Sequence, residues 1–172
     1  MIRRLAFADA PALQTLRLLA LKHDPLSYVS TLKLEASLPL SYHETKISHN
    51  THEPVFGIYG LFAKDELIGT LFLSYEWLTK LAHTGSLYEL FVHPNHRRQG
   101  HGHALLSHVI DQAKSFKALE QITLNVNSGN TASINLYKKH GFIQYGTRPQ
   151  GVKEAGGYQD ELLFYLPLLS KD

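Results

Sequence analysis

The chain has 172 residues with a formal net charge of +2 at pH 7, and 44% of its residues are hydrophobic. This length and composition predict a single folded domain, 1–172. The small net charge argues against a nucleic-acid-binding protein, which normally carries a clustered basic face. The lack of cysteine excludes disulfides, thiolate metal sites and a cysteine nucleophile.

The N-terminal segment does not have the pattern of a signal peptide. Its basic start is not followed by an uninterrupted apolar core, because Asp9 intervenes. The longest apolar stretch of the chain, Val55–Ala63, is far shorter than the ~20 residues of a membrane helix. Together with the lack of cysteine, these features predict a cytoplasmic protein without a membrane partner.

The first third of the chain predicts one short strand followed by helices. Residues 2–7 are predicted as a strand, and Asp9 is predicted to cap a helix over 10–22, where apolar residues recur at helical spacing. A second helical piece should follow and break or bend at Pro39. For residues 37–54 the pattern defines no single structure, and we expect a helix and a mobile loop there.

From residue 55 onwards, predicted strands alternate with helices. Val55–Ala63 and Leu67–Tyr75 are rich in β-branched and aromatic residues and predict a hairpin. Further strands are predicted at 87–92, 122–126, 143–146 and 161–166, and helices at 105–116 and from 130, the latter closed by Gly141. The strand–helix–strand unit 87–126 requires parallel pairing, whereas hairpins are antiparallel. We therefore expect an α/β (α+β) fold with a mixed central sheet of about seven strands and helices on both faces.

The stretch "HPNHRRQGHGHALL", residues 93–106, lies between a predicted strand and a predicted helix. Gly100 and Gly102 remove side chains from this loop, so that its backbone can approach a ligand closely. The following helix offers unpaired N–H groups and a partial positive charge, and Arg97 and Arg98 add full charges. These features predict a phosphate-binding turn. A solvated basic loop remains the alternative from this stretch alone.

Other readings of the same stretch fit the residues less well. A dinucleotide-binding fingerprint requires a third glycine where the chain has Leu105, and a P-loop requires a Lys followed by Ser or Thr. The four histidines have no recognised ligand spacing, and no Asp or Glu lies between them. We therefore expect no metal here.

Two motifs resemble those of the GCN5-related N-acetyltransferase superfamily. Arg97-x-x-Gly100-x-Gly102 resembles its acetyl-CoA signature, and Asn130 with Tyr137 in "NLYKKHGF" resembles its second signature. The resemblance extends from residue 87 to 142 and includes the predicted order of strands and helices. It implies an acyl-CoA acyltransferase fold that transfers an acetyl group from acetyl-CoA, its co-substrate, to a primary amine.

The resemblance also implies which residues bind coenzyme A. The end of the strand at 87–92 would contact the pantetheine arm, and backbone amides of the glycine turn would bind the pyrophosphate. Asn130 would contact the pantetheine region while also capping a helix. The implied cofactor-binding residues are Phe91, Val92, His93, Arg97, Arg98, Gln99, Gly100, His101, Gly102, His103, Asn130 and Ser133.

Two residues are candidates for the chemistry. The resemblance implies that Tyr137 donates a proton to the leaving thiolate, although a buried packing role is the alternative. Glu89 interrupts an apolar strand and is expected on one face with Leu87 and Phe91. It is a candidate base or water-positioning group, with a structural carboxylate as the alternative. The ribosomal-protein branch of the family often has a glutamate where this chain has Asn125, which cannot accept a proton.

The acceptor is defined least well by the sequence. Candidate lining residues are Tyr28, Glu76, Trp77 and Tyr158, each equally compatible with surface or packing roles, and Glu76 would suit a cationic amine. The acceptor would be the amine of a small molecule, a peptide or a protein. Without a cysteine, direct attack in a ternary complex is expected rather than a thioester intermediate on the enzyme. The alternative function is a non-catalytic sensor that binds coenzyme A or an acyl-CoA, and a homodimer is left open.

Overall fold

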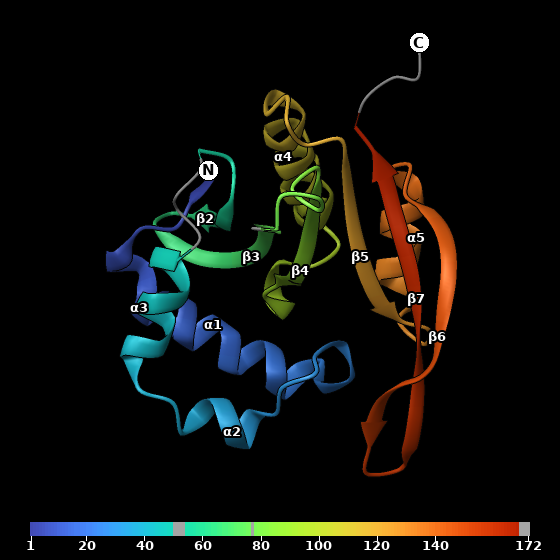
Figure 1. Ribbon diagram of the computed structural model, residues 1–172. Coiled ribbons are helices and arrows are strands. Elements are labelled where there is room, and N and C mark those ends of the chain that lie inside the picture. The colour runs from blue at the N-terminus through green and yellow to red at the C-terminus, as the bar shows by residue number, and fades with distance from the viewer. Residues whose placement is uncertain (50–53, 77, 169–172) are drawn as a thin grey trace.

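The computed structural model describes residues 1–49, 54–76 and 78–168, and its described strands form one mixed sheet (Figure 1). The strands are β1 (Ile2–Arg4), β2 (Gly57–Ala63), β3 (Glu66–Tyr75), β4 (Thr84–Val92), β5 (Gln121–Asn127), β6 (Ile143–Glu154) and β7 (Gly157–Pro167). Their order in the sheet is β1-β2-β3-β4-β5-β7-β6. Only β4 and β5 pair in parallel among the described strands. The predicted mixed seven-stranded sheet is confirmed.

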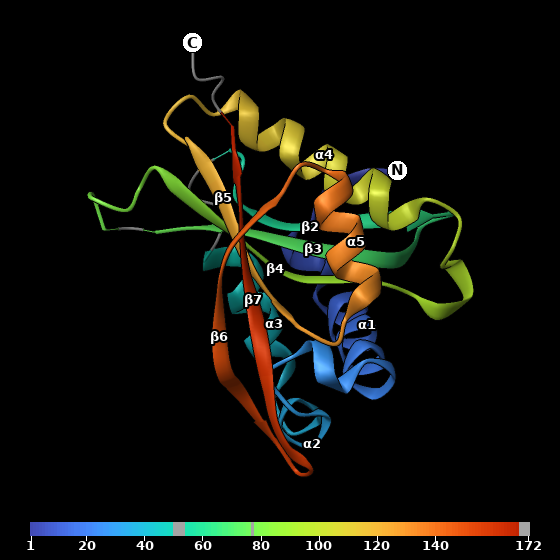
Figure 2. The same ribbon diagram turned by 90° about the vertical axis from the view of Figure 1, so that its right-hand side faces the viewer.

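Helices cover both faces of this sheet, as expected. They are α1 (Ala10–His23), α2 (Leu32–Ala36), α3 (Leu40–His49), α4 (His101–Ser115) and α5 (Thr131–Lys139). Figure 2 shows α4 on one side of β2–β4 and α1 to α3 on the other. Ile134 and Tyr137 of α5 pack in the same apolar cluster as α4. No helix in the described part of the chain combines the length and the apolar character of a membrane span.

Each face of the sheet has its own apolar core. On one face, α4 buries a stripe at helical spacing that includes Leu105, Leu106 and Val109, and Ile134 of α5 joins the same cluster. On the other face, α1 buries its apolar side against Leu5, which follows β1, and against residues of β2, β3 and β4. Full burial of an aliphatic side chain contributes about 1.5–3 kcal/mol, so these two stripes hold the helices to the sheet.

A bulge in β4 changes which face its side chains reach. The pairing of β4 with β3 shifts by one residue between Tyr88 and Phe91, and Glu89 adopts a left-handed φ of +59° within this bulge. The expectation that Leu87, Glu89 and Phe91 share one face is therefore wrong. Leu87 packs in the cluster with α4, whereas Phe91 packs in the cluster with α1, because one extra residue inverts the alternation of a strand.

Strands β4 and β5 pair over only a short stretch at their beginnings. The parallel register joins Thr84–Ser86 to Gln121–Thr123, and beyond it the described residues of the two strands are not paired with each other. Figures 1 and 2 both show the two strands diverging from this point. Since both strands continue to residues 92 and 127, the divergence opens a gap in the middle of the sheet.

Two boundary predictions are wrong at the ends of the chain. The first strand ends at Arg4, and Phe7–Asp9 form a 3₁₀ turn. The last hairpin is much longer than predicted and contains residues 143–154 and 157–167. Most of β6 is exposed at the edge of the sheet, where even Pro149 is tolerated, so its sequence lacks the alternation of a half-buried strand.

The region around Pro39 folds as two short helices. Thr31 caps α2, since its side chain accepts a hydrogen bond of 3.2 Å from the amide of Leu34, and α3 begins directly after Pro39. The break at Pro39 is therefore as expected. Of the segment 37–54, residues 50–53 lie outside the described residues.

Candidate functional site

A cavity of about 800 Å³ lies where β4 and β5 diverge. Its wall contains the end of β4, the turn before α4, the beginning of α5, and residues 23–28. A cavity of this size accommodates a ligand considerably larger than a simple amine. The predicted residues that line it are Tyr28, Phe91, Val92, Arg97, Arg98, Gly100, His101, Gly102, His103, Asn130 and Ser133.

The glycine turn has the geometry of an anion-binding site. Gly100 is the N-cap of α4 with a left-handed φ of +81°, and the preceding Arg98 also has a positive φ of +60°. A Cβ added to Gly100 would meet nothing within 4 Å. The first turn of α4 contains no acidic side chain, and its leading N–H groups have no partners within the helix. The turn therefore offers amides, a helix N-terminus and arginine charge to one cavity.

Arg97 is fixed against the end of β4. Its Nε donates to the carbonyl of Val92 at 2.9 Å, and its guanidinium carbon lies 5.2 Å from the ring centroid of Phe91. Its Nη2 also lies 2.5 Å from Oδ2 of Asp24. The guanidinium is thus pre-positioned at the cavity by three contacts, one of them anionic.

Residues 24–28, here called the bridging segment, connect the two sides of the gap. At one side Asp24 pairs with Arg97. At the other, Asn127 Nδ2 donates to the carbonyl of Leu26 and Asn130 Nδ2 donates to Oγ of Ser27, both at 3.1 Å. Sequence reasoning expected residues 26–48 near the acceptor and named Tyr28 as a lining residue. It did not predict the contacts of Asp24, Leu26 and Ser27, because contacts across about a hundred residues leave no local pattern.

Asn130 fills the capping role expected of it. Its Oδ1 accepts a hydrogen bond of 3.1 Å from the amide of Ser133, which satisfies one free N–H of α5. At the other end of α5, Gly141 has a φ of +86°, and the amide of Phe142 donates to the carbonyl of Tyr137. The predicted cap and closure of this helix are both confirmed.

The histidines around the turn lie near one another without forming a metal site among the described residues. The rings of His103 and His140 are 4.4 Å apart between centroids, and those of His96 and His101 are 6.2 Å apart. Burial, then the neighbouring His103 and Lys139, lowers the pKa of His140. His96, His101 and His103 line the cavity, whereas His140 does not.

Two of the residues expected to bind the cofactor lie outside the cavity. The amide of His93 donates to the carbonyl of Ile68 at 2.8 Å, and its side chain lines a second cavity of about 570 Å³ beside α1. Gln99 is exposed, and its side chain donates to the carbonyl of Asn95 at 3.5 Å. The structure thus concentrates the predicted set on β4, the two glycines and the start of α5.

Tyr137 lies in the core beside the cavity rather than in its wall. It is 8% exposed, and its ring packs against Phe142 with the centroids 5.7 Å apart. Burial raises the pKa of Tyr137, so the phenol keeps its proton at neutral pH. Burial also raises the pKa of Tyr28.

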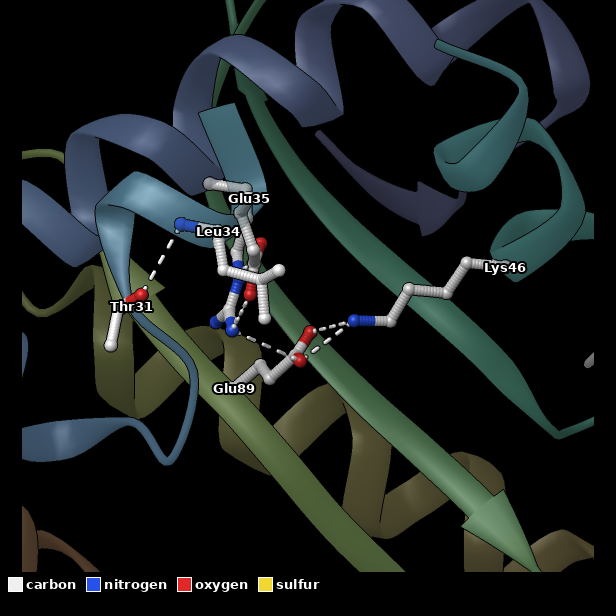
Figure 3. Close-up of polar contacts among 6 residues, drawn as sticks. Thr31, Leu34, Glu35, Lys46 and Glu89 are labelled. Atoms are coloured by element: carbon white, nitrogen blue, oxygen red, sulfur yellow. Dashed lines mark hydrogen bonds and ion pairs between the residues drawn. The ribbon is translucent and has the colours of Figure 1, made fainter. Parts of the chain in front are cut away.

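Glu89 is held by two cations (Figure 3). Both of its carboxylate oxygens lie 2.7 Å from Nζ of Lys46, and Oε1 lies 3.5 Å from Nη2 of Arg17. Arg17 in turn donates to both oxygens of Glu35, at 2.8 and 2.7 Å. The structure therefore places Glu89 in a charge network formed by α1, α2, α3 and β4.

Sequence reasoning missed the other members of this network, although one signal was present. Arg17 occupies a position of the buried stripe of α1, four residues after Leu13 and three before Ala20. A charge on an apolar stripe requires a buried partner, but nothing local identifies Glu35 as that partner. His43 of α3 is buried beside the network, and burial, then Lys46, lowers its pKa.

The expected acceptor residues are dispersed. Tyr28 lines the cavity, whereas Tyr158 is exposed near the tip of the β6–β7 hairpin, with Nζ of Lys153 5.8 Å from its ring centroid. Glu76 follows the end of β3 outside the cavity wall, and Trp77 lies outside the described residues. Gln159 of β7 also lines the cavity, within the segment 151–160 that was expected to contribute to the acceptor pocket.

Comparison with known proteins gives a consistent picture. The family model "Acetyltransferase (GNAT) family" matches residues 20–142. The ribosomal protein bS18-alanine N-acetyltransferase of Escherichia coli K12 is 32% identical over 83 residues, which are 48% of this chain and 55% of that protein. A streptothricin acetyltransferase of Escherichia coli is 32% identical over 124 residues, 68% of each chain. The chain thus spans about half the length of the first of these relatives.

Solved structures share the fold over nearly the whole chain. A GNAT acetyltransferase from Streptococcus pneumoniae superposes with a TM-score of 0.87 at 21% identity, covering 97% of this chain and 98% of that one. The yncA protein of Salmonella typhimurium, a putative acetyltransferase solved with acetyl-CoA, gives a TM-score of 0.81 at 21% identity and covers 100% and 95%.

Proposed function

Because the chain belongs to the acetyltransferase (GNAT) family, we propose that it is an N-acetyltransferase that transfers an acetyl group from acetyl-CoA to a primary amine. The observation that carries this proposal is the cavity between β4 and β5, into which the glycine turn and the start of α5 both open. A cytoplasmic location is proposed with it, in keeping with the cysteine-free sequence.

The residues of the cavity fit a ligand with phosphates at one end and an extended arm. The open space at Gly100, the amides of the first turn of α4 and the two arginines would bind the pyrophosphate. Phe91 and Val92 would contact the pantetheine arm along the end of β4, with Asn130 and Ser133 opposite. The unpaired stretch of β4 supports this, because its backbone groups on that side have no strand partner among the described residues.

The chemistry follows from which groups can hold or move a proton. Acetyl-CoA, when bound, supplies a thioester that an amine can attack directly. Backbone N–H groups near Val92 would stabilise the developing oxyanion. Tyr137, which keeps its proton at neutral pH, would donate it to the leaving thiolate through its hydroxyl. Glu89 already accepts from Lys46 with both oxygens, which favours orienting a water over direct proton abstraction. That water would accept the proton that the amine loses as the new N–C bond forms and the C–S bond breaks.

For the acceptor we propose a chemical class, primary amines of small molecules, peptides or proteins. The relatives are named for the alanine of a ribosomal protein, for streptothricin and for L-amino acids, all of which carry amines. Measuring free-thiol release with acetyl-CoA and a panel of peptide N-termini, amino acids, polyamines and aminoglycosides tests the activity. Acetyl-CoA should also raise the melting temperature, because a ligand that binds only the folded state stabilises it. A melting temperature that does not change at millimolar acetyl-CoA would exclude the proposal. Binding of acetyl-CoA without turnover on any acceptor would favour a sensor.

A further inference from the structure

Arg17 contacts both Tyr28 and Glu89 while it also forms an ion pair with Glu35. It is 8% exposed, and its bidentate contact with Glu35, itself 4% exposed, neutralises the buried charge. Burial alone would lower the pKa of Arg17 and raise that of Glu35, but the polar and charged neighbours of each group, among them its partner in this pair, together reverse both shifts. Glu35 thus accepts from Nε and Nη2 of Arg17, whereas the buried Nη1 has no hydrogen-bond partner among the described residues.

The same guanidinium nevertheless contacts one residue of the cavity wall and the carboxylate of Glu89, which lies outside that wall. Its central carbon lies 4.4 Å from the ring centroid of Tyr28, which lines the cavity, and its Nη2 lies 3.5 Å from Glu89. Arg17 therefore fixes one ring of the cavity wall and one carboxylate through a single planar group, which lysine could not do.

The position of Glu89 makes such support necessary. A non-glycine residue with a left-handed φ is strained and persists only where its surroundings determine it. Lys46 from α3 holds the carboxylate at one side and Arg17 from α1 holds it at the other. The two positive charges of Arg17 and Lys46 balance the two negative charges of Glu35 and Glu89. These contacts therefore hold the bulge without adding net charge to the network.

We propose that Arg17 is a positioning residue for the acceptor: it holds Glu89 and Tyr28 in the arrangement that orients the acceptor amine. This inference rests on the proposed acetyltransferase function and adds to it a residue that does not itself line the cavity. According to this inference, two different elements serve the two substrates: the glycine turn binds coenzyme A, and Arg17 of α1 determines the geometry of the acceptor.

The decisive variant is Arg17→Met combined with Glu35→Met. Replacing a buried ion pair by apolar residues of similar volume is often neutral or stabilising, so this protein should fold with an unchanged or higher melting temperature. We expect the dissociation constant for acetyl-CoA to stay within about twofold, because no pyrophosphate contact changes. The acceptor kcat/KM should fall on the order of 10- to 100-fold, the usual consequence of a misplaced reacting group.

Two further variants keep the test conclusive. Arg17→Lys retains the charge without the planar contacts and should recover only part of the lost kcat/KM. Arg3→Met is the matched control, since Arg3 also pairs with a carboxylate, Asp9, and stacks 4.2 Å over Phe62, yet lies outside the cavity wall. It should leave acceptor kinetics unchanged.

The outcomes distinguish this inference from the function on which it rests. If the wild-type protein shows no turnover on any acceptor, the proposed function is excluded, and this inference is excluded with it. If the wild type is active and the folded double variant has the same acceptor kcat and KM, only the inference about Arg17 is excluded. If the double variant does not fold, full acceptor activity of Arg17→Lys overturns the inference, and a raised acceptor KM with unchanged acetyl-CoA affinity supports it.

Discussion

Asp24 and Arg97 form an ion pair in which Nη2 and Oδ2 are 2.5 Å apart. The pair connects the bridging segment to the arginine that the sequence motif assigns to coenzyme A. A phosphate that binds Arg97 must therefore share the guanidinium with a carboxylate or displace it. The two residues are 73 positions apart in the chain, so the pair also joins the N-terminal helices to the glycine turn.

Asp24→Asn should strengthen coenzyme A binding. The substitution removes a negative charge from the cavity and frees Arg97, and a partly exposed pair of this kind is worth about 0.2–1 kcal/mol. We expect the dissociation constant, measured by titration calorimetry at low salt, to fall about two- to fivefold. Asp111→Asn makes the same charge change on the exposed side of α4 and should have little effect. Weaker binding of Asp24→Asn would mean that the pair supports the site instead of competing for it.

Gly100→Ala should weaken coenzyme A binding more than it weakens the fold. The left-handed φ costs a non-glycine residue about 1–2 kcal/mol, and the new methyl group would lie in the open space of the turn. Gly157→Ala is a matched control, because Gly157 also has a positive φ and open space around its Cβ but lies at the tip of the last hairpin. Both variants should melt at lower temperature, and only Gly100→Ala should raise the dissociation constant, by about tenfold or more. Equal affinities of the two variants would exclude the turn as the phosphate site.

Tyr137→Phe should reduce turnover on the order of 10²-fold with coenzyme A affinity retained, since a general acid contributes about this factor. The control is Tyr59→Phe. Tyr59 is also buried, and burial raises its pKa to about 12, but its hydroxyl donates to the carbonyl of Val55 in the core, outside the cavity wall. That control should lose about 1 kcal/mol of stability and keep its kcat. An unchanged kcat in Tyr137→Phe would assign the tyrosine to packing alone.

Stability should decrease as the pH falls through the range of histidine titration. Burial first, then neighbouring cations, lowers the pKa values of His43 and His140 in the folded protein below the ordinary 6.5. The unfolded chain therefore binds protons that the folded protein does not, starting near pH 6.5 and extending down to the lowered values. We expect the melting temperature to fall between pH 7.5 and pH 5.5. His140→Asn should make this dependence shallower, and an identical pH dependence in that variant would contradict the assignment.

Features set by local sequence could be predicted. The apolar stripe of α4, the cap at Asn130 and the left-handed Gly141 each depend on residues within one or two turns. Together with the two motifs, they were sufficient for the sheet and for 11 of the 23 residues that line the cavity. The glycine turn was identified for the same reason, since its contribution comes from backbone conformation and not from a distant partner.

Features set by long-range packing could not be predicted. The bulge that turns Phe91 to the face of α1 depends on how β3 pairs, and a strict alternation over 87–91 predicts the opposite face. Arg17 and Glu35 become partners only when α1 and α2 pack together. The length of the last hairpin was missed because exposed edge strands have little apolar pattern.

The short pairing of β4 with β5 has a consequence for the integrity of the sheet itself. The sheet consists of two antiparallel halves, one of β1, β2, β3 and β4 and one of β5, β7 and β6, joined by a register of three residue pairs. Each half therefore presents an unpaired edge toward the other, in addition to the outer edges that every open sheet has. Backbone amides along these inner edges should exchange with solvent faster than those on the opposite sides of the same strands. A ligand bound in the cavity would then connect the two halves of the sheet. Without it, the inner edges would stay exposed, and another chain could add a strand there.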